Sequence, residues 1–103
     1  MFRRARFADV IERQLALFVR DHADVVDEAR ERLEAYNRAD RDEAEELYGD
    51  YVDAVETGTE LLADLRDHFG RTLDEDAFEQ YEREFNRAVA KRLPEFALEL
   101  ENR

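Results

Sequence analysis

His22 and His68 are the histidines of the chain, and histidine is the side chain that most often transfers protons or binds metal ions near neutral pH. Helical bundles hold metal pairs with Glu-x-x-His motifs on facing helices. Neither histidine belongs to such a motif, because Val19 stands three residues before His22 and Leu65 three residues before His68. We therefore predict no metal site and no metal cofactor.

His22 is nevertheless unusual, because it interrupts an apolar helical stripe between Phe18 and Val25. If the next helix folds back antiparallel, His22 comes within about one helical turn of Tyr51. Buried polar groups in proteins are usually hydrogen-bonded. We interpret His22 and Tyr51 as a buried polar site in which the histidine bonds to a tyrosine or threonine. The alternative is a small-ligand or metal-binding bundle built around these two residues.

Other catalytic groups are scarce. The chain has no cysteine and no serine, which excludes thiolate and serine nucleophiles. Carboxylates cluster at Asp42, Glu43, Glu45 and Glu46, but general acid–base catalysis needs a positioned partner, and no histidine accompanies them. They are typical of a solvated helix face. We predict that the protein is not an enzyme, with no catalytic residues and no bound cofactor.

The stretch from Ala44 to Phe69 must position whatever site exists. Apolar residues recur along it at alternating steps of four and three, the spacing of a helix that keeps one seam against its neighbours. The seam consists of Ala44, Tyr48, Tyr51, Val55, Gly58, Leu62, Leu65 and Phe69. A glycine inside a helix costs ~1 kcal/mol relative to alanine. We therefore predict that Gly58 marks a close approach between helices, with Phe85 or Phe18 as the neighbour.

Similar periodicity predicts a helix on either side of this one. The first covers residues 5–36 and the last covers residues 73–101, with Thr72 as its N-cap and Gly70 as a left-handed cap before it. Pro94 should kink or break the last helix, because proline removes a backbone hydrogen bond. Short connections make neighbouring helices antiparallel. We predict an all-α fold, a single domain over residues 1–103: an antiparallel up-down-up three-helix bundle with long helices at about 5–36, 41–69 and 73–101.

The charge of the chain is strongly negative, with 28 acidic residues against 16 basic ones and a net charge of −12. A compact chain with this charge repels itself, and salt at ~1 M shortens the Debye length to about 3 Å. We interpret the charge as that of a halophile's cytoplasmic protein; a GC-rich genome that favours arginine over lysine is the alternative. No apolar run approaches the ~20 residues that span a bilayer, so we expect no membrane partner.

Surplus apolar residues near both ends of the chain indicate a surface that binds a partner. This predicted partner surface consists of Phe7, Val10, Leu17, Phe96 and Leu98. The leading hypothesis is a non-enzymatic protein-interaction or assembly module, a homodimer or a complex with another protein. A third hypothesis is a regulatory protein whose basic N-terminal arm, with Arg3, Arg4 and Arg6, binds nucleic acid, although the overall charge disfavours nucleic acid as a partner.

Overall fold

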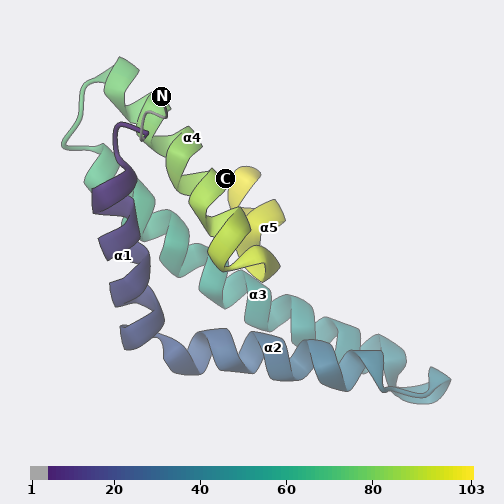
Figure 1. Cartoon of the computed structure of the whole chain (residues 1–103). Helices are drawn as coiled ribbons and strands as arrows, with labels where there is room; N and C mark the ends of the chain where they lie inside the picture. The colour runs from purple at the N-terminus through teal and green to yellow at the C-terminus, as the bar shows by residue number, and fades with distance from the viewer. Residues whose placement is uncertain (1–4) are drawn as a thin grey trace.

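The computed structural model describes residues 5–103, and its regular elements are all helical (Figure 1). The predicted all-α class is therefore confirmed for this part of the chain. The elements are α1 (Ala8–Asp21), α2 (Ala23–Asn37), α3 (Arg41–Gly70), α4 (Glu75–Arg92), the 3-10 helix η1 (Pro94–Phe96) and α5 (Ala97–Glu101).

The predicted single helix over residues 5–36 is wrong, because the chain breaks at His22. This residue has φ −122° and ψ 35°, outside the helical region, and it ends α1 and precedes α2. The two helices then leave His22 in different directions, so that α1 runs beside α4 while α2 runs beside α3 (Figure 1).

The spacing of the buried residues along the chain changes at this break. α1 buries Ile11, Leu15 and Phe18, and the next buried residue is Val26, eight positions after Phe18. A continuous seam would have continued at Val25, which is only half-buried. One extra residue rotates the apolar face by about 100° around the helix axis. The two halves of the predicted helix can therefore bury their apolar faces against different neighbours.

The connection between α3 and α4 also differs in detail from the prediction. Asp74, and not Thr72, is the N-cap of α4: its side chain accepts a hydrogen bond from the N–H of Ala77 at 2.8 Å. Gly70 is not a left-handed cap, because no glycine in residues 5–103 has a positive φ. It instead leaves room for Phe78, whose ring would overlap with a side chain at that position.

Near Pro94 the chain reverses. α4 ends at Arg92, η1 begins at Pro94, and α5 packs back against both α3 and α4 (Figure 1). α4 has 18 residues and α3 has 30, so the last helix does not accompany α3 over its whole length. The arrangement therefore differs from three helices of similar length side by side.

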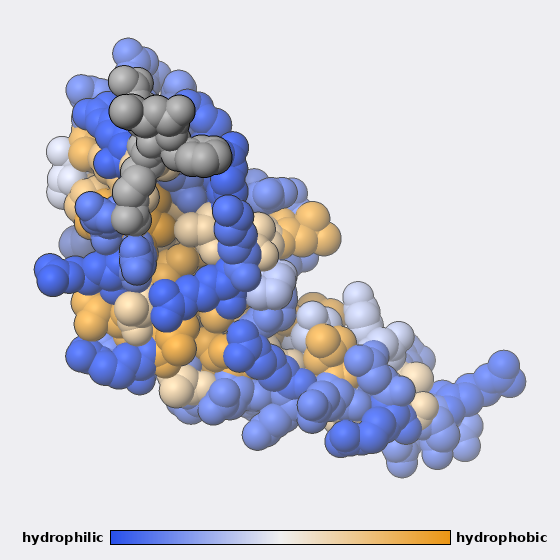
Figure 2. All heavy atoms as spheres, viewed as in Figure 1, coloured by the Kyte–Doolittle hydropathy of each residue, from blue (hydrophilic) through white to orange (hydrophobic). Residues whose placement is uncertain are grey.

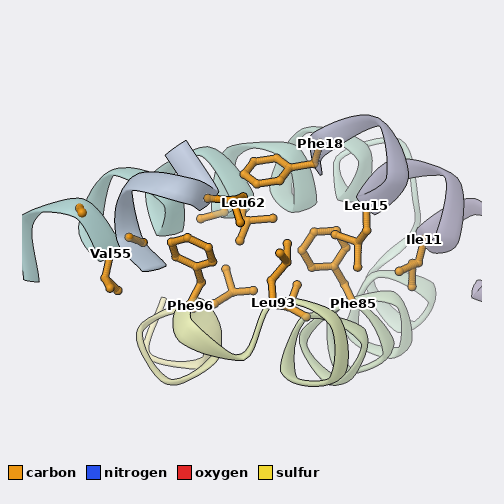
Figure 3. Close-up of a cluster of buried hydrophobic side chains, with 14 of the residues drawn as sticks. Ile11, Leu15, Phe18, Val55, Leu62, Phe85, Leu93 and Phe96 are labelled. Carbon is orange, nitrogen blue, oxygen red and sulfur yellow. The ribbon is translucent and has the colours of Figure 1, made fainter. Parts of the chain in front are cut away.

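The hydrophobic core lies where α1, α3, α4 and η1 meet. Figure 3 shows Leu15, Leu62, Phe85, Leu93 and Phe96 pointing toward one another from these elements and the segment between α4 and η1. Phe85 and Phe96 are both fully buried. Phe96 therefore cannot belong to the predicted partner surface: the reversal at Pro94 turns it into the core.

Gly58 is a point of close approach, but its neighbour is Phe96 and not the predicted Phe85 or Phe18. A methyl group on Gly58 would overlap with the Phe96 ring, with two of the ring carbons at only 2.7 and 2.8 Å. Because the ring is enclosed on all sides, it has no free space to retreat into.

Replacing Gly58 by alanine tests this contact. The steric overlap should outweigh the better helix propensity of alanine, so Gly58→Ala should lower the free energy of unfolding by about 1–2 kcal/mol in urea denaturation. Gly49 is the matched control, because it lies in the same helix and a methyl group added to it would have no neighbouring atom within 4 Å. Gly49→Ala should raise stability by about 0.5–1 kcal/mol. A Gly58→Ala protein more stable than wild type would rule out the close contact.

Candidate interaction surface

The hairpin formed by the end of α2 and the beginning of α3 projects from the rest of the molecule (Figure 1). Here residues 30–53 are called the arm, and α1, α4, η1, α5 and residues 54–70 of α3 are called the body. Although the apolar spacing continues through the arm, none of its 24 residues is buried. The projection gives the molecule an elongated shape of 50 × 27 × 24 Å. The arm is therefore a pair of helices without a third helix to cover its apolar side.

Polar contacts hold the two helices of the arm together and tie its base to the body. Arg32 donates two hydrogen bonds to one oxygen of Glu28, at 2.8 and 3.0 Å, and also lies 3.4 Å from Asp50 on α3. At the base, the guanidinium of Arg30 donates to Glu95 of η1 at 2.9 Å. Glu95 is largely buried, so this pair fixes where the arm leaves the body.

A row of tyrosines follows the uncovered side of the arm. The ring centroids of Tyr36 and Tyr48 are 5.2 Å apart, and those of Tyr48 and Tyr51 are 6.4 Å apart. Tyr48 is 51% exposed, and Val52, one turn further along α3, is 41% exposed. We call Tyr36, Tyr48, Tyr51 and Val52 the tyrosine face. Figure 2 shows pale and orange atoms on the upper side of the arm, above hydrophilic atoms on its lower side.

Tyr51 lies at the inner end of the tyrosine face. Burial raises the pKa of its hydroxyl, and the negative charge of Glu95 acts in the same direction. The hydroxyl therefore stays protonated at neutral pH and can donate a hydrogen bond.

The predicted buried polar site of His22 and Tyr51 is not assembled. The His22 ring packs against Phe18 with a centroid distance of 5.0 Å, whereas Tyr51 packs against Tyr48. Both residues are half-buried, and within residues 5–103 no hydrogen bond joins them. The physical reason is the helix break, which places His22 at a corner of the chain and not in the middle of a seam.

The rest of the predicted partner surface is dispersed. Phe7 packs edge-on against Tyr81 at 5.4 Å, and Val10 packs against the core. Leu17 and Leu98 are exposed, at 42% and 71%. They belong to α1 and α5, which lie on different sides of α4 (Figure 1). These residues therefore do not form one continuous patch.

The basic residues near the N-terminus that the sequence singled out are Arg3, Arg4 and Arg6. Arg3 and Arg4 lie outside the described residues. Arg6 is exposed, and its guanidinium carbon lies 5.0 Å from the centre of the Phe7 ring. In residues 5–103 no group of histidine or carboxylate side chains has the arrangement of a metal site.

Arg66 is the residue that reasoning from the sequence missed. Its side chain is only 1% exposed, and its guanidinium donates to Asn86 at 3.0 Å and to Asp67 at 2.9 Å. It also donates to the main-chain oxygens of Leu100 and Arg103, each at 3.3 Å. Arg66 thereby fastens the end of α5 to α3.

The sequence does contain a signal for this burial. Arg66 stands seven residues after Thr59 and four before Gly70, and all three are buried. A second buried row therefore runs beside the heptad seam. An arginine in such a row can remain buried only if acceptors surround it.

Tyr81 is a second fully buried polar residue. Its hydroxyl donates a hydrogen bond to Gln14 of α1 at 2.8 Å, and its ring packs against Phe7, Phe69 and Phe85. Burial raises the pKa of Tyr81 to about 12, although the bond to Gln14 opposes the shift. This residue joins α1 to α4 inside the body.

Comparison with models of known protein families, with curated proteins and with solved structures found no match to this chain. Within the described part of the chain, none of the helices combines the length and apolar character needed to cross a membrane.

Replacing Arg66 by methionine tests its role. Methionine fills similar space but removes the hydrogen bonds that the buried guanidinium donates to Asp67, Asn86 and the end of α5, so stability should fall by about 3 kcal/mol in urea denaturation. Arg71→Met, at an exposed site, is the control and should change stability by less than about 0.5 kcal/mol. If Arg66→Met were as stable as wild type, these hydrogen bonds would not be what holds α5.

Alkaline titration tests the burial of Tyr81. Its pKa is higher in the folded protein than the usual value near 10, so the folded state retains a proton that the unfolded state loses. The contribution of Tyr81 to the free energy of unfolding is therefore complete below about pH 10, and it is lost as the pH rises toward about 12. Denaturation curves between about pH 9 and 12 should show this fall, and Tyr81→Phe should flatten it. An unchanged slope in Tyr81→Phe would contradict the assignment.

Proposed function

We propose that this protein is a non-enzymatic assembly module that binds a second copy of itself through the tyrosine face of the arm. The observation that carries the proposal is that the arm keeps the apolar spacing of a packed helix pair while none of its residues is buried. An amphipathic stripe is stable when another element covers it. A second arm supplies that cover.

The geometry of the arm favours a helical partner. Residues 41–53 of α3, 13 residues in all, lie in the arm before the buried part that begins at Ala54, a length of about 20 Å. Two such hairpins packed face to face make an antiparallel four-helix bundle, for which heptad spacing is the appropriate pattern. Tyrosine is enriched in protein interfaces, because its ring is apolar and its hydroxyl still finds a hydrogen-bond partner.

The charge of the arm makes this pairing dependent on salt. Residues 30–53 carry nine acidic and four basic side chains, so two arms repel each other in dilute buffer. Salt at ~1 M screens the repulsion to within about 3 Å. The net charge of −12 favours a working environment of high salt, as in the cytoplasm of a halophile.

Sedimentation velocity at about 0.2 M and 2 M KCl tests the proposal. The wild-type protein should form dimers, more strongly at the higher salt concentration. Tyr48→Glu should raise the dimer dissociation constant at least tenfold, because it places a charge in the apolar contact. Leu17→Glu is the matched control: Leu17 is 42% exposed, against 51% for Tyr48, but lies on α1, so its replacement should leave the dimer intact.

Two outcomes would contradict the proposal. One is a monomer at about 100 µM protein at both salt concentrations. The other is a dimer that Leu17→Glu disrupts and Tyr48→Glu does not, which would move the contact to α1. Circular dichroism should first establish that both variants are folded, as expected for changes at exposed positions.

A further inference from the structure

A groove between α1 and α4 forms a second distinctive surface, on the body and separate from the tyrosine face. It encloses about 300 Å³, the lower end of the range for small-molecule sites. Its floor is apolar and includes Ala8, Ile11, Leu15 and Ala88. Figure 2 shows hydrophobic atoms between α1 and α4 with hydrophilic side chains beside them. The small side chains of Ala8 and Ala88 leave space that an unbranched alkyl chain can occupy.

The rim of the groove carries three cations against two carboxylates, Glu12 and Glu84, and therefore a net positive charge. Arg87, Lys91 and Arg92 line it from α4, and none of them makes a hydrogen bond or ion pair with residues 5–103. The nearby Glu84 carboxylate is already engaged, because it accepts hydrogen bonds from the N–H of Phe7 at 2.8 Å and from Gln80 at 2.9 Å.

Three such cations lie beside this apolar groove in a chain with 28 acidic and 16 basic residues. The dipole of α4 favours cations in its last turn, which accounts for Lys91 and Arg92 near the end of the helix. It does not account for Arg87, one turn earlier, nor for the apolar groove beside all three. An apolar floor with a rim of net positive charge matches a ligand with an alkyl chain and an anionic head.

We propose that this groove binds a medium-chain alkyl carboxylate. The alkyl chain lies along the floor between α1 and α4, and the carboxylate accepts hydrogen bonds from Lys91 and Arg87 at the rim. Each buried methylene group should raise the affinity by up to about fourfold, so decanoate should bind several-fold more tightly than octanoate. This site goes beyond the proposed assembly function and uses none of the residues of the tyrosine face.

Isothermal titration calorimetry tests the site, with monomeric decanoate, 1-decanol and acetate as probes. Decanoate should bind with one-to-one stoichiometry, decanol about tenfold more weakly, and acetate not measurably. The double variant Arg87→Gln, Lys91→Gln should reduce decanoate affinity about tenfold and leave decanol binding unchanged. Ala88→Leu, which fills the floor, should abolish the binding of both.

Arg83→Gln is the matched control, because Arg83 is an exposed arginine on the same helix and does not line the groove. It should bind decanoate as the wild type does. Equal affinity for decanol and decanoate, or equal loss in Arg83→Gln and in the double variant, would overturn the proposal. So would binding to vesicles of anionic phospholipid in the absence of decanoate binding, which would assign the cations to a lipid surface. The positions of Arg83, Arg87 and Lys91 outside the core make these variants informative even if Ala88→Leu fails to fold.

Discussion

Phe96 reaches the centre of the molecule because residue 58 of α3 has no side chain. The ring occupies the space that a methyl group would need, and around it meet α3, α4 and the short helices after Pro94. Arg66 fixes the same region from the polar side through the main-chain oxygens of Leu100 and Arg103. Together these contacts hold α5 against the body, and with α5 in that place no segment of residues 5–103 remains to cover the arm.

The sequence predicted the helical class correctly because its apolar spacing is long and regular. It also indicated that Gly58 was a packing position, since a glycine in the middle of a seam is costly. The predicted neighbour was wrong because the prediction assumed that the last helix continues straight. Once the chain reverses at Pro94, Phe96 and not Phe85 lies opposite Gly58.

The break at His22 and the burial of Arg66 were harder to foresee. No proline or glycine marks the break, and His22 has a spacing that fits an unbroken seam. Its cause is tertiary: Val26 is buried in place of Val25 because α1 and α2 pack on different partners. The burial of Arg66 was not predicted because charged residues normally lie on exposed faces, and its burial depends on acceptors from α3, α4 and the end of α5 that only the folded structure brings together. Tyr48 and Tyr51 of the tyrosine face belong to the predicted seam, but their exposure follows from the short length of α4.

α3 is one continuous helix that belongs to two regions of different local stability. Its residues from Ala54 onward lie in the core, whereas its first turns contact mainly α2. Opening of the arm to solvent therefore requires far less free energy than opening of the second half of the same helix. If a second copy packs on the arm as proposed, ordering of the arm costs conformational entropy, which lowers the affinity and makes the contact readily reversible. One continuous helix therefore joins a sparsely packed half to a well-packed half, so that local opening of the arm leaves the core intact.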